Sequence, residues 1–268
     1  MAIYLKTEDE IELMRKANLL VSKTLLEVGK HIKPGVSTLT LDMIAESFIR
    51  DHGAVPTFKG FPNPFGNPFP GSICTSVNSV VVHGVPSATM ILKDGDIISV
   101  DCGVLLNGFN GDSCYTFTVG EVSTEIQRLL HITKQSLYEG ISKALPGNRI
   151  GDISHAIQSI CESNGYGVVR ELTGHGIGRQ MHEDPPVPNY GSEGTGLKIR
   201  NGLCIAIEPM ITLGKREIGL LPDKWSIMTL DRKPAAHFEH TIAIHHGKAD
   251  IMSSFEDVEK IEQQRLNK

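Results

Sequence analysis

At 268 residues, the chain is long enough for one large domain or two small ones, and its composition is that of an ordinary globular protein. The net charge of −5 gives no sign of a nucleic-acid partner, and the sequence shows neither an apolar run of membrane-spanning length nor a secretory signal pattern at Met1. The five cysteines are odd in number and form no Cys-x-x-Cys pair. They argue against a disulfide framework and a structural zinc site, and predict reduced thiols in a cytoplasmic protein.

Two helix pairs are predicted, and each precedes strand-like sequence. A capping box that starts at Thr7 opens the first helix, which ends before Pro34-Gly35, and the second helix ends at Gly53. The same order recurs in the second half of the chain, where one helix ends before Pro146-Gly147 and the next at Gly165. We interpret the recurrence as a weak internal duplication, with halves of about 1–120 and 121–268 in a single domain spanning 1–268.

Between the two helix pairs, an aromatic loop precedes strand-like sequence. The residues from Phe58 to Pro70 are rich in Pro, Gly, Asn and Phe, which predicts an irregular surface loop. Three of its phenylalanines, Phe61, Phe65 and Phe69, either line an apolar pocket or anchor the loop. The stretch 72–82 then predicts a strand that ends at His83-Gly84.

The stretch from Ser99 to Tyr115 predicts two apolar strands joined at Asn107-Gly108, a dipeptide suited to a turn with positive φ at both positions. This register places Asp112 opposite Gly103 and Asp101 two residues away on the same strand, so the two carboxylates lie on one face. Buried carboxylates require a compensating cation. From the hairpin alone, a cation site and a solvated pair of polar residues are equally good interpretations.

Three more polar residues stand out in the second half of the chain. His175 lies between glycines, Glu208 stands near the end of an apolar run, Glu239 begins another, and a rigid connector is predicted from Pro185-Pro186 to Leu197. With Asp101 and Asp112, these side chains offer oxygen and imidazole ligands suited to Mn²⁺, Fe²⁺, Co²⁺ or Zn²⁺. Four carboxylates supply enough negative charge for two divalent ions, as in two-metal hydrolases.

These residues and their local sequences resemble one known family, the methionine aminopeptidases, in the short bacterial form called type I. The resemblance covers nearly the whole chain, and rests on His83-Gly84, Asp101 with Asp112, Gly174-His175-Gly176-Ile177-Gly178, Met181-His182-Glu183, Ile207-Glu208-Pro209-Met210 and Glu239-His240-Thr241. It implies the pita-bread α/β fold, in which two pseudo-symmetric halves surround a curved antiparallel sheet with helices outside. It further implies a single catalytic domain that removes the initiator methionine from peptides whose second residue is small.

The resemblance also implies roles for the ligands. Asp112 and Glu239 would bridge two divalent metal ions, His175 and Glu208 would complete one ion, and Asp101 the other. A hydroxide that bridges the metals would attack the scissile carbonyl, while Glu208 transfers the proton.

Substrate contacts are implied in the same way. His83 and His182 would hydrogen-bond the substrate, stabilise the oxyanion and assist departure of the amine. By position, Cys74, Met181, Trp225 and Phe69 match the wall that receives the methionine side chain. His83 would also restrict the second substrate residue to small side chains.

Four positions depart from the family's usual pattern. Met181 stands where phenylalanine is frequent, His237 where glutamine is frequent, and Gly103 and Ala206 where threonine is frequent. The missing threonines would remove hydrogen-bond donors behind the ligands, which puts metal affinity and turnover in question.

Two alternatives remain open from the sequence. One is a related hydrolase such as a proline-directed peptidase, and the other is a non-catalytic binding protein on the same fold. The ligand types do not select one metal. We expect a monomer that acts on peptides or nascent chains, with a transient ribosome contact. A basic cluster would make this contact or would simply form a solvated face, namely Lys215, Arg216, Lys224, Arg232 and Lys233.

Overall fold

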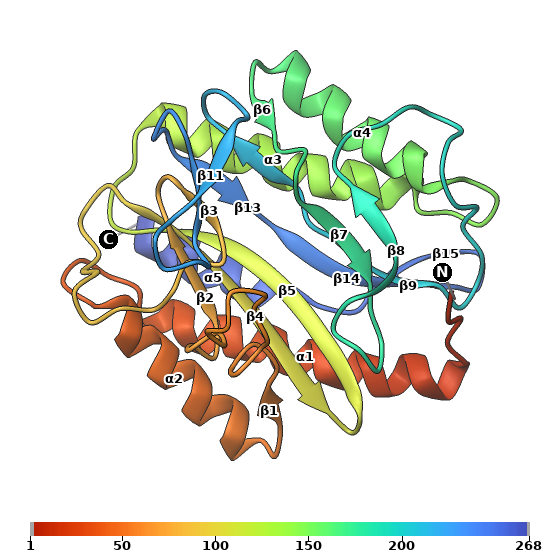
Figure 1. The fold of residues 1–268 in the computed structure, drawn as a ribbon, viewed down its shortest axis with the longest axis horizontal. Coiled ribbons are helices and arrows are strands. Elements are labelled where there is room, and N and C mark those ends of the chain that lie inside the picture. The colour runs from red at the N-terminus through yellow and green to blue at the C-terminus, as the bar shows by residue number, and fades with distance from the viewer. Residues whose placement is uncertain (1–2, 267–268) are drawn as a thin grey trace.

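The two predicted helix pairs are present in the computed structural model, which describes residues 3–266. At the start of the first helix, the Thr7 hydroxyl accepts a hydrogen bond from the Glu10 N–H and the Glu10 carboxylate accepts one from the Thr7 N–H, which completes the capping box. Within each pair the helices pack against each other, and the pairs lie at opposite sides of the molecule (Figure 1). The four helices are α1 (Glu8–His31), α2 (Thr38–Asp51), α3 (Thr124–Lys143) and α4 (Ile150–Ser163).

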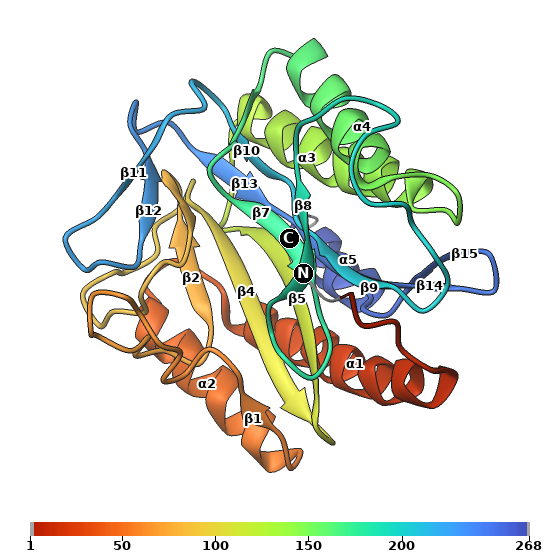
Figure 2. The ribbon, with the colours of Figure 1, turned by 45° about the vertical axis from the view of Figure 1, so that its right-hand side comes forward.

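An antiparallel sheet of nine strands lies between the helix pairs, and its main path runs β1-β4-β5-β14-β9-β7-β8 (Figure 2). Two additional strands extend it, β2 beside β4 and β15 beside β14. The strands of this sheet are β1 (Val55–Pro56), β2 (Cys74–Val77), β4 (Ile97–Leu106), β5 (Phe109–Thr118), β7 (Thr173–Gly176), β8 (Glu183–Pro188), β9 (Cys204–Ile207), β14 (Glu239–His245) and β15 (Lys248–Ile251). Residues from the sheet and from both helix pairs form one hydrophobic core.

Two three-stranded sheets flank the main one. One has the order β13-β10-β6 and the other β11-β12-β3. Their strands are β3 (Val80–Val82), β6 (Gly167–Val168), β10 (Met210–Thr212), β11 (Ile218–Leu220), β12 (Ile227–Thr229) and β13 (Ala235–His237). A last helix, α5 (Glu256–Leu266), was not anticipated from the sequence. Among the described residues, no helix is long and apolar enough to cross a membrane.

The predicted hairpin is confirmed in its strands, turn and register. β4 and β5 are joined at Asn107 and Gly108, both with positive φ, and Gly103 pairs with Asp112. Helix α1 packs against the outer side of this hairpin, and Asn18 accepts a hydrogen bond from the Asp112 N–H through its side-chain oxygen. A Cβ at Gly111 would lie 2.6 Å from the Asn18 backbone nitrogen, so only glycine permits this close approach. This contact fixes the position of Asp112 relative to α1.

Three predicted segments differ in detail. The strand expected over 72–82 is two strands, because Asn78 adopts a left-handed conformation with φ of 50° and turns the chain between β2 and β3. The expected connector that starts at Pro185-Pro186 begins instead within strand β8, where prolines are tolerated because β8 is an edge strand. The apolar run that contains Glu208 breaks between β9 and β10, which leaves this glutamate between two sheets.

Candidate active site

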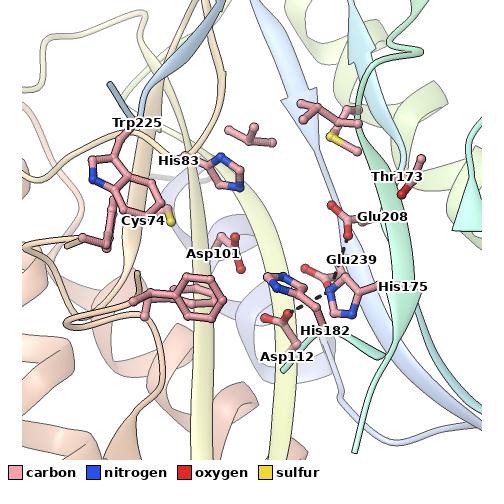
Figure 3. Close-up of a pocket in the computed structure, with 16 residues that line it drawn as sticks. Cys74, His83, Asp101, Asp112, Thr173, His175, His182, Glu208, Trp225 and Glu239 are labelled. Atoms are coloured by element: carbon pink, nitrogen blue, oxygen red, sulfur yellow. Dashed lines mark ion pairs between the residues drawn. The ribbon is translucent and has the colours of Figure 1, made fainter. Parts of the chain in front are cut away.

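A cavity of about 330 Å³ opens beside the centre of the main sheet, and the loops after β1 and before β12 complete its wall. Polar side chains gather at one end and aromatic side chains at the other (Figure 3). The cavity is lined by Phe58, Phe61, Phe69, Cys74, Val82, His83, Asp101, Asp112, Leu172, Thr173, His175, His182, Glu208, Met210, Trp225 and Glu239.

All five expected metal ligands line the polar end. Strand pairing brings the acidic residues together, because Asp101 and Glu239 both pair with Cys114 of β5 from opposite sides. His175 Nε2 lies 3.7 Å from Asp112 Oδ2 and 3.7 Å from Glu208 Oε1. One ligand atom each of Asp112, His175 and Glu239 falls within a mutual distance of 4.8 Å.

The backbone carbonyls of the acidic residues are anchored by neighbouring side chains. The Ser113 hydroxyl donates to the Glu239 carbonyl at 2.6 Å, and the Thr241 hydroxyl donates to the Asp112 carbonyl at 2.8 Å. These two bonds cross between β5 and β14 in opposite directions. They hold the backbone in place and leave the carboxylates directed into the cavity.

Burial in the absence of a cation changes the protonation of these carboxyls. Desolvation raises the pKa of Asp101 to about 7. It also raises the pKa values of Asp112 and Glu239 well above their ordinary range, and the negative charges of neighbouring carboxylates raise them further. Glu208 behaves in the same way, with burial as the main cause of its raised pKa. The cluster therefore binds protons when no other cation compensates it.

The arrangement of the donor atoms fits a metal centre. Asp101 Oδ1, Asp112 Oδ1 and Glu239 Oε1 are buried and have no hydrogen-bond partner among the described residues. The His175 ring donates through Nδ1 to the Gly176 carbonyl at 2.8 Å, which directs the lone pair of Nε2 toward the carboxylates. Buried acceptors without donors and an oriented imidazole are the features that a divalent cation requires.

The aromatic end of the cavity is an apolar slot. Phe69 and Trp225 meet edge to face with ring centroids 5.1 Å apart, and the Trp225 indole donates to the Asn67 carbonyl at 2.9 Å. Cys74 contributes a thiol whose pKa is raised well above its ordinary value by burial, so it remains protonated. A slot of rings and sulfur suits a flexible apolar side chain.

Two histidines lie between the polar and the aromatic end (Figure 3). The His182 ring is 4.4 Å from the His175 ring and 5.3 Å from the Phe61 ring. His83 has a left-handed backbone with φ of 58°, and burial lowers its pKa to about 4. Burial also lowers the pKa of His182. Both rings are neutral at pH 7 and can hydrogen-bond a substrate.

Comparisons with known proteins agree with this geometry. Residues 12–246 match Metallopeptidase family M24. The methionine aminopeptidase of Clostridium acetobutylicum is 49% identical over 94% of this chain and 98% of the relative, and methionine aminopeptidase 1 of Bacillus subtilis is 49% identical over 94% and 99%. The chain belongs to the methionine aminopeptidases of metallopeptidase family M24. It is therefore a hydrolase of the metal-dependent aminopeptidase class.

Solved structures confirm the fold. The methionine aminopeptidase of Rickettsia prowazekii superposes with a TM-score of 0.90 at 40% identity, covering 94% of this chain and 100% of that one. The prolidase of Pyrococcus furiosus shares the fold alone, at 21% identity and a TM-score of 0.75, with 93% of this chain and 65% of that chain covered. The pita-bread architecture of methionine aminopeptidases is thus the architecture of this chain.

Met181 does not lie where the resemblance to methionine aminopeptidases placed it. Its side chain is buried in a cluster with Ile11 and Met14, behind Phe58 and Phe61, and is not among the residues that line the cavity. A Cβ at Gly103 would lie 2.9 Å from the Met181 Cε and 2.8 Å from the Phe58 ring. Two departures from the usual family pattern, Met181 and Gly103, are therefore in contact with each other.

Several cavity residues were missed by the sequence reasoning. Thr173 and Met210 each stand two positions from an expected ligand, His175 and Glu208 respectively, and both line the cavity. Residues two apart share a strand face, which is a signal that could have found Thr173. Phe65, by contrast, is 62% exposed and lies outside the cavity lining.

Proposed function

We propose that the chain removes the initiator methionine from nascent proteins and peptides whose second residue is small, with two divalent metal ions at the polar end of the cavity. The observation that supports this most directly is the pairing of two sites in one cavity. A cluster of uncompensated carboxylates with an oriented histidine lies beside an apolar slot of sulfur and aromatic rings. The first suits peptide-bond hydrolysis with metal ions, and the second suits a thioether side chain.

Five residues would hold the ions, which are Co²⁺, Mn²⁺, Fe²⁺ or Zn²⁺ by ligand type. Asp112 and Glu239 lie centrally and would bridge both, His175 and Glu208 would complete one, and Asp101 the other. When bound, divalent ions lower the pKa of water and polarise the scissile carbonyl. Glu208 lies at the rim of the cluster with a raised pKa, which suits it to accept a proton and return it.

The two central histidines would act on the substrate rather than on the metal. Nε2–H or Nδ1–H groups of His83 and His182 would donate hydrogen bonds to the carbonyl oxygen and assist the departing amine. The free α-amine of the substrate would lie toward Asp101, which explains why only N-terminal residues are removed. Cys74, Phe69 and Trp225 would surround the methionine side chain, and His83 would exclude a large second residue.

The decisive test is methionine release by metal-free protein titrated with Mn²⁺, Co²⁺ or Fe²⁺. We expect cleavage of Met-Ala-Ser, no cleavage of Met-Leu-Ser, and dependence on added metal. Cleavage of both peptides would contradict the restriction at the second residue. A protein that cleaves neither peptide with any of the ions would contradict the proposed reaction.

We also propose a partner, a compartment and an oligomeric state, which rest on features outside the cavity. Lys215, Lys224 and Lys233 are exposed, as a transient ribosome contact would require. All five cysteines are free and buried, which suits a reducing cytoplasm. We further propose a single catalytic domain, because one core cluster joins both helix pairs to the main sheet, and a chain that acts as a monomer. Sedimentation of the full chain tests the monomer.

A further inference from the structure

Two adjacent histidines meet at the turn between β14 and β15, away from the cavity. The ring centroids of His245 and His246 are 3.8 Å apart. Successive side chains of a strand point to opposite faces, so neighbouring imidazoles meet only where the backbone leaves the extended conformation. It does so at His246, whose φ is 49°, and Gly247 follows with φ of 78°.

A carboxylate from a distant part of the sequence completes this group. Glu8, the first residue of α1, places Oε1 3.6 Å from His245 Nε2. That Nε2 atom is buried and has no hydrogen-bond partner among the described residues. One ligand atom from each of Glu8, His245 and His246 lies within 4.8 Å of the others.

We propose that Glu8, His245 and His246 bind one divalent transition-metal ion, of the Zn²⁺ or Ni²⁺ class, at a surface site distinct from the catalytic cavity. Two imidazole nitrogens and one carboxylate oxygen form a donor set that these ions prefer. Glu8 and His246 are exposed, so water has access to the remaining coordination positions. None of the three residues lines the cavity. A bound ion would tie the start of α1 to the β14–β15 turn.

The test counts Ni²⁺ ions bound to the full chain after desalting, in the wild type and in His246→Asn. Asparagine tolerates a left-handed backbone, so this variant keeps the turn while removing the imidazole. We expect His246→Asn to bind one ion fewer per chain and to keep wild-type methionine release and wild-type thermal stability without metal. His131→Asn, which removes an exposed histidine of α3, is the matched control and should bind as many ions as the wild type. Equal ion counts in His246→Asn and wild type would overturn the assignment.

A second, independent observation concerns His237, at the end of β13. The residue is 2% exposed, and its backbone is held by Thr116, which accepts from the His237 N–H at 3.0 Å and donates to its carbonyl at 2.7 Å. Its Nε2 lies 3.6 Å from Glu208 Oε2 and has no hydrogen-bond partner among the described residues. A buried donor without a partner is costly, and the facing carboxylate is the acceptor within reach.

We infer that His237 is a positioning residue for Glu208. A small rotation lets Nε2–H donate to Oε2, which leaves Oε1, the oxygen that faces His175, directed toward the metal site. His237 does not line the cavity, so it acts through the glutamate and not on the substrate. The inference rests on the proposed metal-binding role of Glu208.

Calorimetric titration with Mn²⁺ tests the role of His237 without relying on activity. His237→Leu removes the donor, and loss of such a partner weakens metal binding by about 10–100-fold. His237→Gln restores a donor and should recover most of the affinity, while KM for Met-Ala-Ser stays unchanged in both variants. A folded His237→Leu protein with wild-type affinity would overturn the inference. If the wild type itself bound no Mn²⁺, the proposed function would fail instead.

Discussion

The two ends of the cavity have opposite effects on the stability of the fold. At the polar end, one buried carboxylate oxygen each of Asp101, Asp112 and Glu239 has no hydrogen-bond partner among the described residues, and burial raises the pKa values of all three carboxyls, so the fold opposes their ionisation. At the aromatic end, Phe69 is buried against the edge of the half-buried Trp225 ring, and the burial of Phe69 stabilises the fold. The polar end therefore lowers the stability of the metal-free fold and is arranged to bind a cation, whereas the aromatic end raises the stability of the fold.

Asp112→Asn should break the polar end alone. We expect methionine release to be abolished and the metal content to fall, because a central ligand is lost. The metal-free variant should nevertheless melt at a higher temperature than the wild type at pH 8, since a neutral amide replaces a carboxyl that resists ionisation. Metal analysis and thermal melts measure both effects.

A buried aspartate outside the cavity provides the control for that variant. Burial raises the pKa of Asp42 as well, but Asp42 Oδ1 accepts hydrogen bonds from the Ser72 and Ile73 N–H groups, partners that Asp112 Oδ1 lacks among the described residues. Asp42→Asn should lower the melting temperature of the metal-free protein. An Asp112→Asn protein that is also destabilised at pH 8 would contradict the proposed electrostatic strain.

The histidines between the two ends should affect the rate without affecting the metal. For His182→Ala and His83→Ala we expect unchanged metal content and a fall in kcat of about 10²–10⁴-fold, the usual contribution of a positioned acid or base. Metal analysis and steady-state kinetics on Met-Ala-Ser are the measurements. A His182→Ala protein that bound no metal would refute the division between ligands and substrate-contacting groups.

Phe69→Ala should break the aromatic end alone. The side chain is 2% exposed, and truncation of a buried phenylalanine lowers the free energy of unfolding by about 3–5 kcal/mol. KM for Met-Ala-Ser should rise, because the methionine slot is widened, while the metal content stays at the wild-type value. Urea denaturation and kinetics test this variant, and a loss of metal would show that the two ends are not independent.

The pH dependence of stability should reveal the contribution of the carboxyls at the polar end. Asp101 ionises near its ordinary pKa of 3.8 in the unfolded chain but at about 7 in the folded one. The pKa values of Asp112, Glu208 and Glu239 are also raised well above their ordinary range in the folded chain, so between pH 6.5 and 8 the folded state binds more protons and the metal-free protein loses stability as pH rises. The buried histidines act in the other direction, most strongly below their ordinary pKa of 6.5, because burial lowers the folded pKa values of His83, His175, His182, His237 and His240. Saturating Mn²⁺ should abolish the loss above pH 6.5, which melting curves would show. A metal-free protein that becomes more stable from pH 6.5 to 8 would contradict this account.

Local sequence chemistry predicted the parts of the site that depend on local structure. Asn107-Gly108 determines the hairpin turn, and the turn determines the register that brings Asp101 and Asp112 to one face. His175, Glu208 and Glu239 stood out as polar residues on glycine-rich or apolar stretches, but their separate roles followed from a resemblance, because no local rule brings His175 on β7 next to Glu208 after β9. Their approach depends on the pairing of both strands in the large sheet.

What the sequence did not reveal are contacts between side chains from separate elements. The closeness of His237 to Glu208 arises because β13 pairs with β10, on the far side of the break that contains the glutamate. Met181 was assigned to the pocket wall by resemblance alone. The segment before it is glycine-rich and irregular, so no strand alternation shows which way its side chain points. Only the folded chain shows that Met181 occupies the space beside Gly103.

That last contact gives the smallest predicted effect and tests the wall behind the aromatic end. Gly103→Ala places a Cβ against the Phe58 ring and the Met181 Cε, and overpacking costs about 1–3 kcal/mol. We expect the lower end of this range, because Cε is the tip of a flexible side chain. In a Met181→Ala background the same substitution should cost less, while metal content stays unchanged in all four proteins. Urea denaturation of the cycle measures the coupling. If the losses in free energy of unfolding caused by the two substitutions are additive, the glycine at 103 has not adapted to the methionine at 181. If the two free-energy changes are not additive, the two departures from the family pattern, at positions 103 and 181, depend on each other through packing.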